Sequence, residues 1–151
     1  MVNDVDMKET NSAYMQQFRG GFTSALRWHH LDDLWQQVRA RPDGWYVYAI
    51  GETLPTESLS AQSLSLFVDE IDTLLHREHD EDYCGIVYAD DLQIPDMIKI
   101  YDPNNLGVSC GYSDNPPLPG WVLSHIPPVD IQANMVIPAN RRRWWQRFIG
   151  R

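Results

Sequence analysis

The side chains most able to do chemistry gather between residues 76 and 84, where the sequence reads HREHDEDYC. Imidazole, carboxylate and thiolate groups are the usual ligands of zinc and other divalent transition metals. His76 and His79 are three residues apart, so at the end of a helix both rings can face one ion, with Asp82 and Cys84 as further ligands. The spacing matches no standard zinc motif such as H-E-x-x-H. The alternative interpretation is a solvated helix end followed by one buried structural cysteine.

His29 and His30, followed by Asp32 and Asp33, form a second group. Adjacent residues of a helix point about 100° apart, so two neighbouring histidines rarely bind the same ion. Carboxylates near the start of a helix are stabilised by the positive end of its dipole. This group is therefore more typical of a capping turn than of a ligand set.

The two cysteines, Cys84 and Cys110, each precede a glycine. On neighbouring strands their thiols could meet as a redox pair or a soft-metal site, but the chain has no C-x-x-C motif. Free cysteine is among the most buried residue types, so core packing is the favoured role for each. Two cysteines do not make a disulfide framework, and residues 1–17 lack an apolar stretch behind a basic start. We therefore expect a cytoplasmic protein.

The C-terminal segment combines basic and large aromatic side chains, in the series Arg141, Arg142, Arg143, Trp144, Trp145, Arg147 and Phe148. In a helix the aromatic side chains would share one face, which is how a peptide docks into the groove of a protein partner. Arginine and tryptophan are also enriched among the residues that dominate binding energy. The alternatives are peripheral attachment to a membrane, contact with RNA, and folding of the segment back onto the rest of the chain.

Charge is divided unequally along the 151 residues. Residues 141–151 hold five arginines and no acid, so all 21 acidic residues lie within residues 1–140. An acidic body repels phosphate, which argues against general nucleic-acid binding. No apolar run approaches the roughly 18 residues that a membrane-spanning helix needs, so we expect no transmembrane segment.

Hydrophobic periodicity predicts two main helices that would position these groups. Apolar residues at three- and four-residue spacing predict a helix from about residue 60 to Glu78, with Ser58 or Ser60 as its N-cap. A second apolar stripe predicts a helix within residues 23–41, which Pro42 and Gly44 would end. Its members are Leu31, Leu34, Trp35 and Val38.

Strands are predicted at residues 45–50, 84–89 and 97–101, with weaker candidates at 107–110 and 121–124. The order strand, helix, strand between residues 45 and 89 is a βαβ pattern, in which parallel pairing would require a right-handed crossover. The expected fold class is α+β: a βαβ core extended by an antiparallel meander, giving a mixed sheet of about four or five strands with two main helices.

One domain is the natural expectation for this length. We expect a flexible N-terminal arm over residues 1–21 and a single globular domain over residues 22–126. Residues 127–151 would form a proline-interrupted segment that leads into the basic aromatic tail.

The sequence contains no G-x-S-x-G elbow, no P-loop and no G-x-G-x-x-G. We therefore expect a non-enzymatic protein–protein interaction module, such as an accessory or assembly factor, an adaptor or an inhibitor, which needs no cofactor. The alternative is a metal-binding protein or metal-dependent enzyme that holds an ion such as zinc in the His76–Cys84 cluster.

Overall fold

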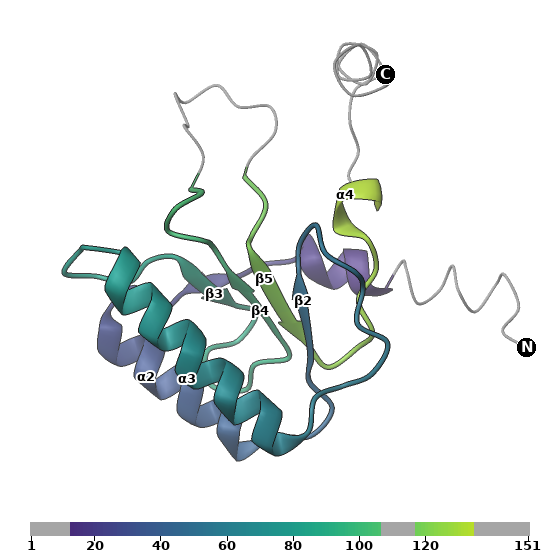
Figure 1. Ribbon diagram of the computed structural model, residues 1–151, viewed down its shortest axis with the longest axis horizontal. Helices are drawn as coiled ribbons and strands as arrows, with labels where there is room; N and C mark the ends of the chain where they lie inside the picture. Colours follow the sequence, from purple (N-terminus) through teal and green to yellow (C-terminus); the bar gives the residue numbers. More distant parts are fainter. Residues whose placement is uncertain (1–12, 107–116, 135–151) are drawn as a thin grey trace, which may run out of the picture.

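The computed structural model describes residues 13–106 and 117–134, which form one antiparallel sheet packed between two layers (Figure 1). The two long helices are α2, Trp28–Ala40, and α3, Ala61–Glu78. The Ser60 hydroxyl caps α3 by accepting a hydrogen bond from the Ser63 amide at 3.1 Å. The helix buries Leu64, Val68, Ile71 and Leu75, as their spacing predicts. A four-residue helix, α4, covers Ile131–Asn134.

The sheet has five strands in the order β1-β3-β4-β5-β2. Their bounds are β1, Thr23–Ser24; β2, Tyr46–Ala49; β3, Val87–Ala89; β4, Met97–Ile100; and β5, Trp121–Ser124. The α+β class, with five strands and two main helices, is confirmed. The weaker strand candidate at 107–110 lies outside the described residues.

Every strand pairing is antiparallel, so the prediction of a βαβ core in a mixed sheet is wrong. The reason is the position of β5, which pairs with β2 on one side and with β4 on the other. Leu123 is the register partner of both Val47 and Ile98. The last strand thus occupies the place beside β2 that the βαβ pattern gives to β3.

Helices α2 and α3 lie side by side against one face of the sheet (Figure 1). The core beneath them joins the apolar stripes of both helices to inward side chains of the strands, including Val87, Ile98 and Leu123. Trp45 is fully buried in this core, and its indole N–H donates to the Arg41 carbonyl at 2.8 Å.

The opposite face of the sheet carries a second core, which the sequence did not predict. Residues 13–18 are helical and bury Tyr14, Met15 and Phe18 against Met97 and Val122. Val129 and Ile131 complete the same cluster. Residues 13–18 and 128–131 thus belong to the folded body, although the sequence assigns them to a flexible arm over residues 1–21 and to a proline-interrupted segment over residues 127–151. Apolar residues in both segments cover a sheet face that would otherwise meet water.

Within residues 13–106 and 117–134, no helix combines the length and apolar composition of a membrane span.

Candidate functional site

The four predicted metal ligands do not converge on one point. His79 follows the end of α3 and is buried, and its ring Nε2 donates to the Cys84 carbonyl oxygen at 2.9 Å. Cys84 is fully buried, and burial raises the pKa of its thiol, which disfavours the thiolate that metals bind. Asp82 is exposed. Among the described residues, no group of three ligand atoms within 4.8 Å includes His79, Asp82 or Cys84.

The segment instead forms an aromatic cluster around Trp28. The Trp28 ring stacks on His76 with a centroid separation of 4.0 Å, and it meets His79 edge-on at 6.1 Å. Tyr83 also packs edge-on with His79, with the ring centroids 6.0 Å apart. The Trp28 indole N–H donates to the Glu81 carbonyl at 3.1 Å, which ties α2 to the loop after α3. The histidines that looked like metal ligands serve as ring partners.

Part of this cluster is open to solvent. Leu26 is 51% exposed and Tyr83 is 43% exposed. Both side chains lie over Gly85, because a methyl group built there would be 3.2 Å from Tyr83 Cδ2 and 3.9 Å from Leu26 Cδ1. We call Leu26, Trp28, His76 and Tyr83 the Trp28 patch.

His76 does take part in a group of possible ligands, with Asp32 and Asp72, whose ligand atoms lie within 4.8 Å of one another. The Asp72 carboxylate is already engaged, since its Oδ1 accepts from the Trp35 indole N–H at 3.0 Å and lies 3.6 Å from His76 Nε2. Through these contacts, Asp72 links α3 to Trp35 of α2 and also lies beside His76 of its own helix.

In the group of His29, His30, Asp32 and Asp33, it is His30 that takes part in capping α2. The N-cap of α2 is Arg27, and its backbone amide donates to His30 Nδ1 at 3.2 Å. Asp32 and Asp33 lie beyond the first turn of α2, so their predicted capping role is wrong. For either carboxylate to cap α2, the helix would have to begin after Trp28.

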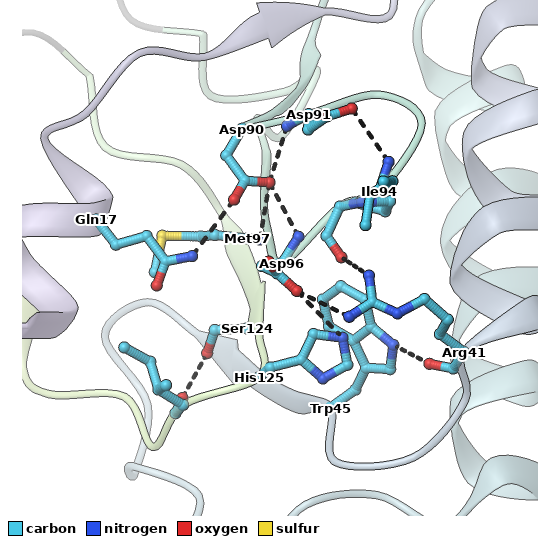
Figure 2. A network of polar contacts seen from close by, with 12 residues as sticks. Gln17, Arg41, Trp45, Asp90, Asp91, Ile94, Asp96, Met97, Ser124 and His125 are labelled. Atoms are coloured by element: carbon cyan, nitrogen blue, oxygen red, sulfur yellow. Dashed lines mark hydrogen bonds and ion pairs between the residues drawn. The ribbon is translucent and has the colours of Figure 1, made fainter.

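A polar network closes one end of the sheet (Figure 2). Asp90 Oδ1 accepts backbone amides from Asp91, Asp96 and Met97 at 2.9, 3.0 and 3.1 Å. Its other oxygen lies 3.4 Å from Gln17 Nε2, which links the helix over residues 13–18 to this loop. One carboxylate thus fixes the β3–β4 connection.

Asp96 continues the network toward α2 and β5 (Figure 2). Its Oδ1 is 3.1 Å from Arg41 and 4.0 Å from His125 Nε2. Burial and the nearby Arg41 guanidinium lower the pKa of His125, which favours the neutral ring. The His125 ring packs against Trp45 at 3.8 Å between centroids. This environment makes His125 a packing group beside the core.

Lys99 occupies a pocket on the second face of the sheet. It lies on β4, opposite Tyr88 of β3 and Val122 of β5. The pocket has a volume of about 330 Å³ and is otherwise lined by Phe22, Gly85, Ile86, Tyr88, Tyr101, Leu106 and Pro117. The Lys99 ammonium lies 4.1 Å from the ring centroid of Phe18 and 3.9 Å from that of Phe22. Burial lowers the pKa of Lys99 to about 8.

In the sequence, Lys99 lies between Ile98 and Ile100, and this alternation predicts a half-buried strand with Lys99 on its other face, without indicating a pocket. The face of the sheet that carries Lys99 would meet solvent only if the residues before β1 left it uncovered. Phe18 and Phe22 supply this cover, with their rings next to the Lys99 ammonium.

Two predicted features lie outside the described residues. These are the basic aromatic series 141–148 and Cys110, so the tail interaction and the thiol pair stay predictions. Cys84 itself is a free, buried thiol.

Comparison with protein-family models, with curated proteins and with solved structures gives no match for this chain.

Proposed function

We propose that this protein is a non-enzymatic interaction module of the cytoplasm, which acts as an accessory factor, adaptor or inhibitor by holding a protein partner. The observation that carries the proposal is the Trp28 patch. Its exposed leucine and aromatic rings are residue types that bury well in protein interfaces. The free Cys84 thiol is consistent with a reducing compartment.

The patch is pre-organised, which favours binding. Trp28 is held by stacking on His76 and by the hydrogen bond to Glu81. Rings that are already fixed lose little conformational freedom when a partner covers them. Tyrosine and tryptophan are also the side chains most often found at binding hot spots.

The rim of the patch defines the chemistry of the partner. Asp80, Glu81 and Asp82 are exposed beside Tyr83, so the rim is acidic. A partner surface with an apolar centre and basic residues around it would match the patch in polarity at its centre and in charge at its rim. The arginine and tryptophan series 141–148 would provide a second contact with the partner. This segment is basic, whereas the rest of the chain is acidic.

Affinity purification from the native host, followed by mass spectrometry, tests the proposal. The baits are the full chain, the double variant Leu26→Ser/Tyr83→Ala, and a variant lacking residues 141–151. We expect a partner recovered by the full chain to be depleted at least tenfold by the double variant, because about 1.4 kcal/mol of lost binding energy is enough for that change. Removal of 141–151 should also weaken capture while leaving the folded core intact.

The matched control is Leu66→Ser. Leu66 is 57% exposed on α3, and ten residues of helix separate it from His76, a distance of about 15 Å. This variant should recover the partner as well as the full chain does. If all baits recover the same proteins, the interaction proposal fails.

The alternative function is a metal-binding protein or metal-dependent enzyme that uses the His76–Cys84 cluster. We favour it less because, among the described residues, no group of three ligand atoms within 4.8 Å includes His79, Asp82 or Cys84. Elemental analysis of the purified protein separates the two. A stoichiometric metal that disappears in His76→Ala/His79→Ala would favour the rival.

A further inference from the structure

The Lys99 pocket holds a cation without a counter-ion among the described residues. No carboxylate within residues 13–106 or 117–134 lies within ion-pair distance of its ammonium. The groups next to the ammonium are the rings of Phe18 and Phe22. Aromatic faces attract a cation but do not neutralise it. A half-buried charge in this state gains from an anion that can enter the same space.

We propose that this pocket binds a small aromatic carboxylate, with the Lys99 ammonium as its counter-ion. This site is separate from the Trp28 patch and does not depend on the proposed protein partner.

The lining selects the body of the ligand. Tyr88 and Tyr101 meet edge-on with centroids 5.6 Å apart, and with Phe22 they give the pocket aromatic walls. Leu106 and Pro117 add aliphatic surface. A flat ring bearing one acidic group can pack against these walls while its carboxylate approaches Lys99. A volume of about 330 Å³ is at the small end for ligand pockets, so the ligand is small.

The charge selects a carboxylate over a phosphate. Lys99 is the only cationic side chain that lines the pocket among the described residues. Phosphate sites usually combine several cations or a row of backbone amides, whereas one ammonium balances one carboxylate. With a pKa of about 8, roughly nine-tenths of the Lys99 side chains are charged at pH 7, so the counter-ion is present without a ligand.

The first test is titration of the full chain with sodium benzoate at pH 7, followed by backbone amide NMR. We expect saturable shifts confined to residues around the pocket. Benzamide keeps the ring and size but has no charge, and acetate keeps the charge but has no ring. Both should bind at least tenfold more weakly than benzoate.

Variants locate the effect. Lys99→Met keeps the apolar stem and should weaken benzoate binding at least tenfold, while Lys99→Arg keeps the charge and should stay within a few-fold of the full chain. The only other lysine in the sequence is Lys8, so Lys8→Met is the matched control and should leave benzoate binding unchanged. Equal binding of benzamide and benzoate, or unchanged benzoate affinity in Lys99→Met, would overturn the proposal.

A second measurement needs no variant. Reductive methylation of the full chain, read by mass spectrometry, should be slowed several-fold at Lys99 by saturating benzoate and left unchanged at Lys8. Equal labelling of Lys99 with and without benzoate would overturn the proposal. So would an absence of saturable NMR shifts up to about 20 mM benzoate, even if an acidic peptide were then found to bind.

Discussion

At the scale of single residues, Lys99 is a basic group whose burial opposes its own charge. Burial lowers its pKa to about 8, from 10.5 for a free side chain. Below pH 8 both the folded and the unfolded chain are protonated there, and the folded state bears the full cost of burying the charge. Between pH 8 and 10.5 the unfolded chain binds more protons, so the free energy of unfolding contributed by this group rises with pH.

Lys99→Met should therefore stabilise the ligand-free protein at pH 7 and lose most of that advantage near pH 10. The side chain is only half-buried and its two ring contacts favour the charged form, so we expect a gain of about 1 kcal/mol rather than the full value of the pKa shift. Thermal unfolding at the two pH values measures it, as a rise of roughly 2–4 °C at pH 7. A lower melting temperature for Lys99→Met at pH 7 would contradict this account of Lys99.

At the scale of elements, the β3–β4 connection depends on one side chain. Asp90 Oδ1 accepts three backbone amides within a span of seven residues (Figure 2). Without the carboxylate, these three amides lose the acceptor that holds them. A carboxylate that gathers several amides acts as the local substitute for secondary structure.

Asp90→Ala should lower the free energy of unfolding by about 2 kcal/mol, because it leaves part-buried amides without acceptors. Asp90→Asn retains a carbonyl acceptor and should cost roughly half as much. Urea denaturation followed by tryptophan fluorescence gives both values. Loss of stability that is equal for Asn and Ala would mean that charge, rather than the hydrogen bonds, holds the loop.

Local signals on the chain predicted the elements better than their arrangement. The spacing of Leu64, Val68, Ile71 and Leu75 and the Ser60 cap are local, so α3 could be placed to within a residue or two. The neighbour of β2 is decided by Leu123, more than seventy residues away, and no local pattern encodes that choice. Ring partners such as Trp28 and His76 are also far apart in sequence, which is why the His76–Cys84 segment resembled a metal site before its partners were known.

At the scale of the whole molecule, one sheet separates two apolar cores. The larger lies beneath α2 and α3, and the smaller lies beneath the helix over residues 13–18. The smaller core is built from both ends of the described chain, since Phe18 and Ile131 belong to it. The smaller core therefore holds residues 13–18 and 128–131 against the sheet, although the sequence places both segments outside the globular domain.

Phe18→Ala tests that role. Removal of a buried phenylalanine should cost about 3 kcal/mol, because it leaves a cavity and also takes away one ring that faces Lys99. Gln16→Ala, at an exposed position of the same helix, is the control and should change stability by less than about 0.5 kcal/mol. Equal stability of the two variants in thermal unfolding would mean that the second core does not support the fold.

The position of β5 has a consequence for how the protein is made. During translation β2 leaves the ribosome some seventy residues before β5, which is its only strand partner within residues 13–106 and 117–134. Until Trp121–Ser124 emerges, a nascent chain can join β1, β3 and β4, but the backbone of Tyr46–Ala49 lacks its β5 partner. Such an edge is open to chaperones and to pairing with other chains. Synthesis that stalls before residue 121 should therefore yield fragments that aggregate, whereas full-length chains released from the ribosome should not.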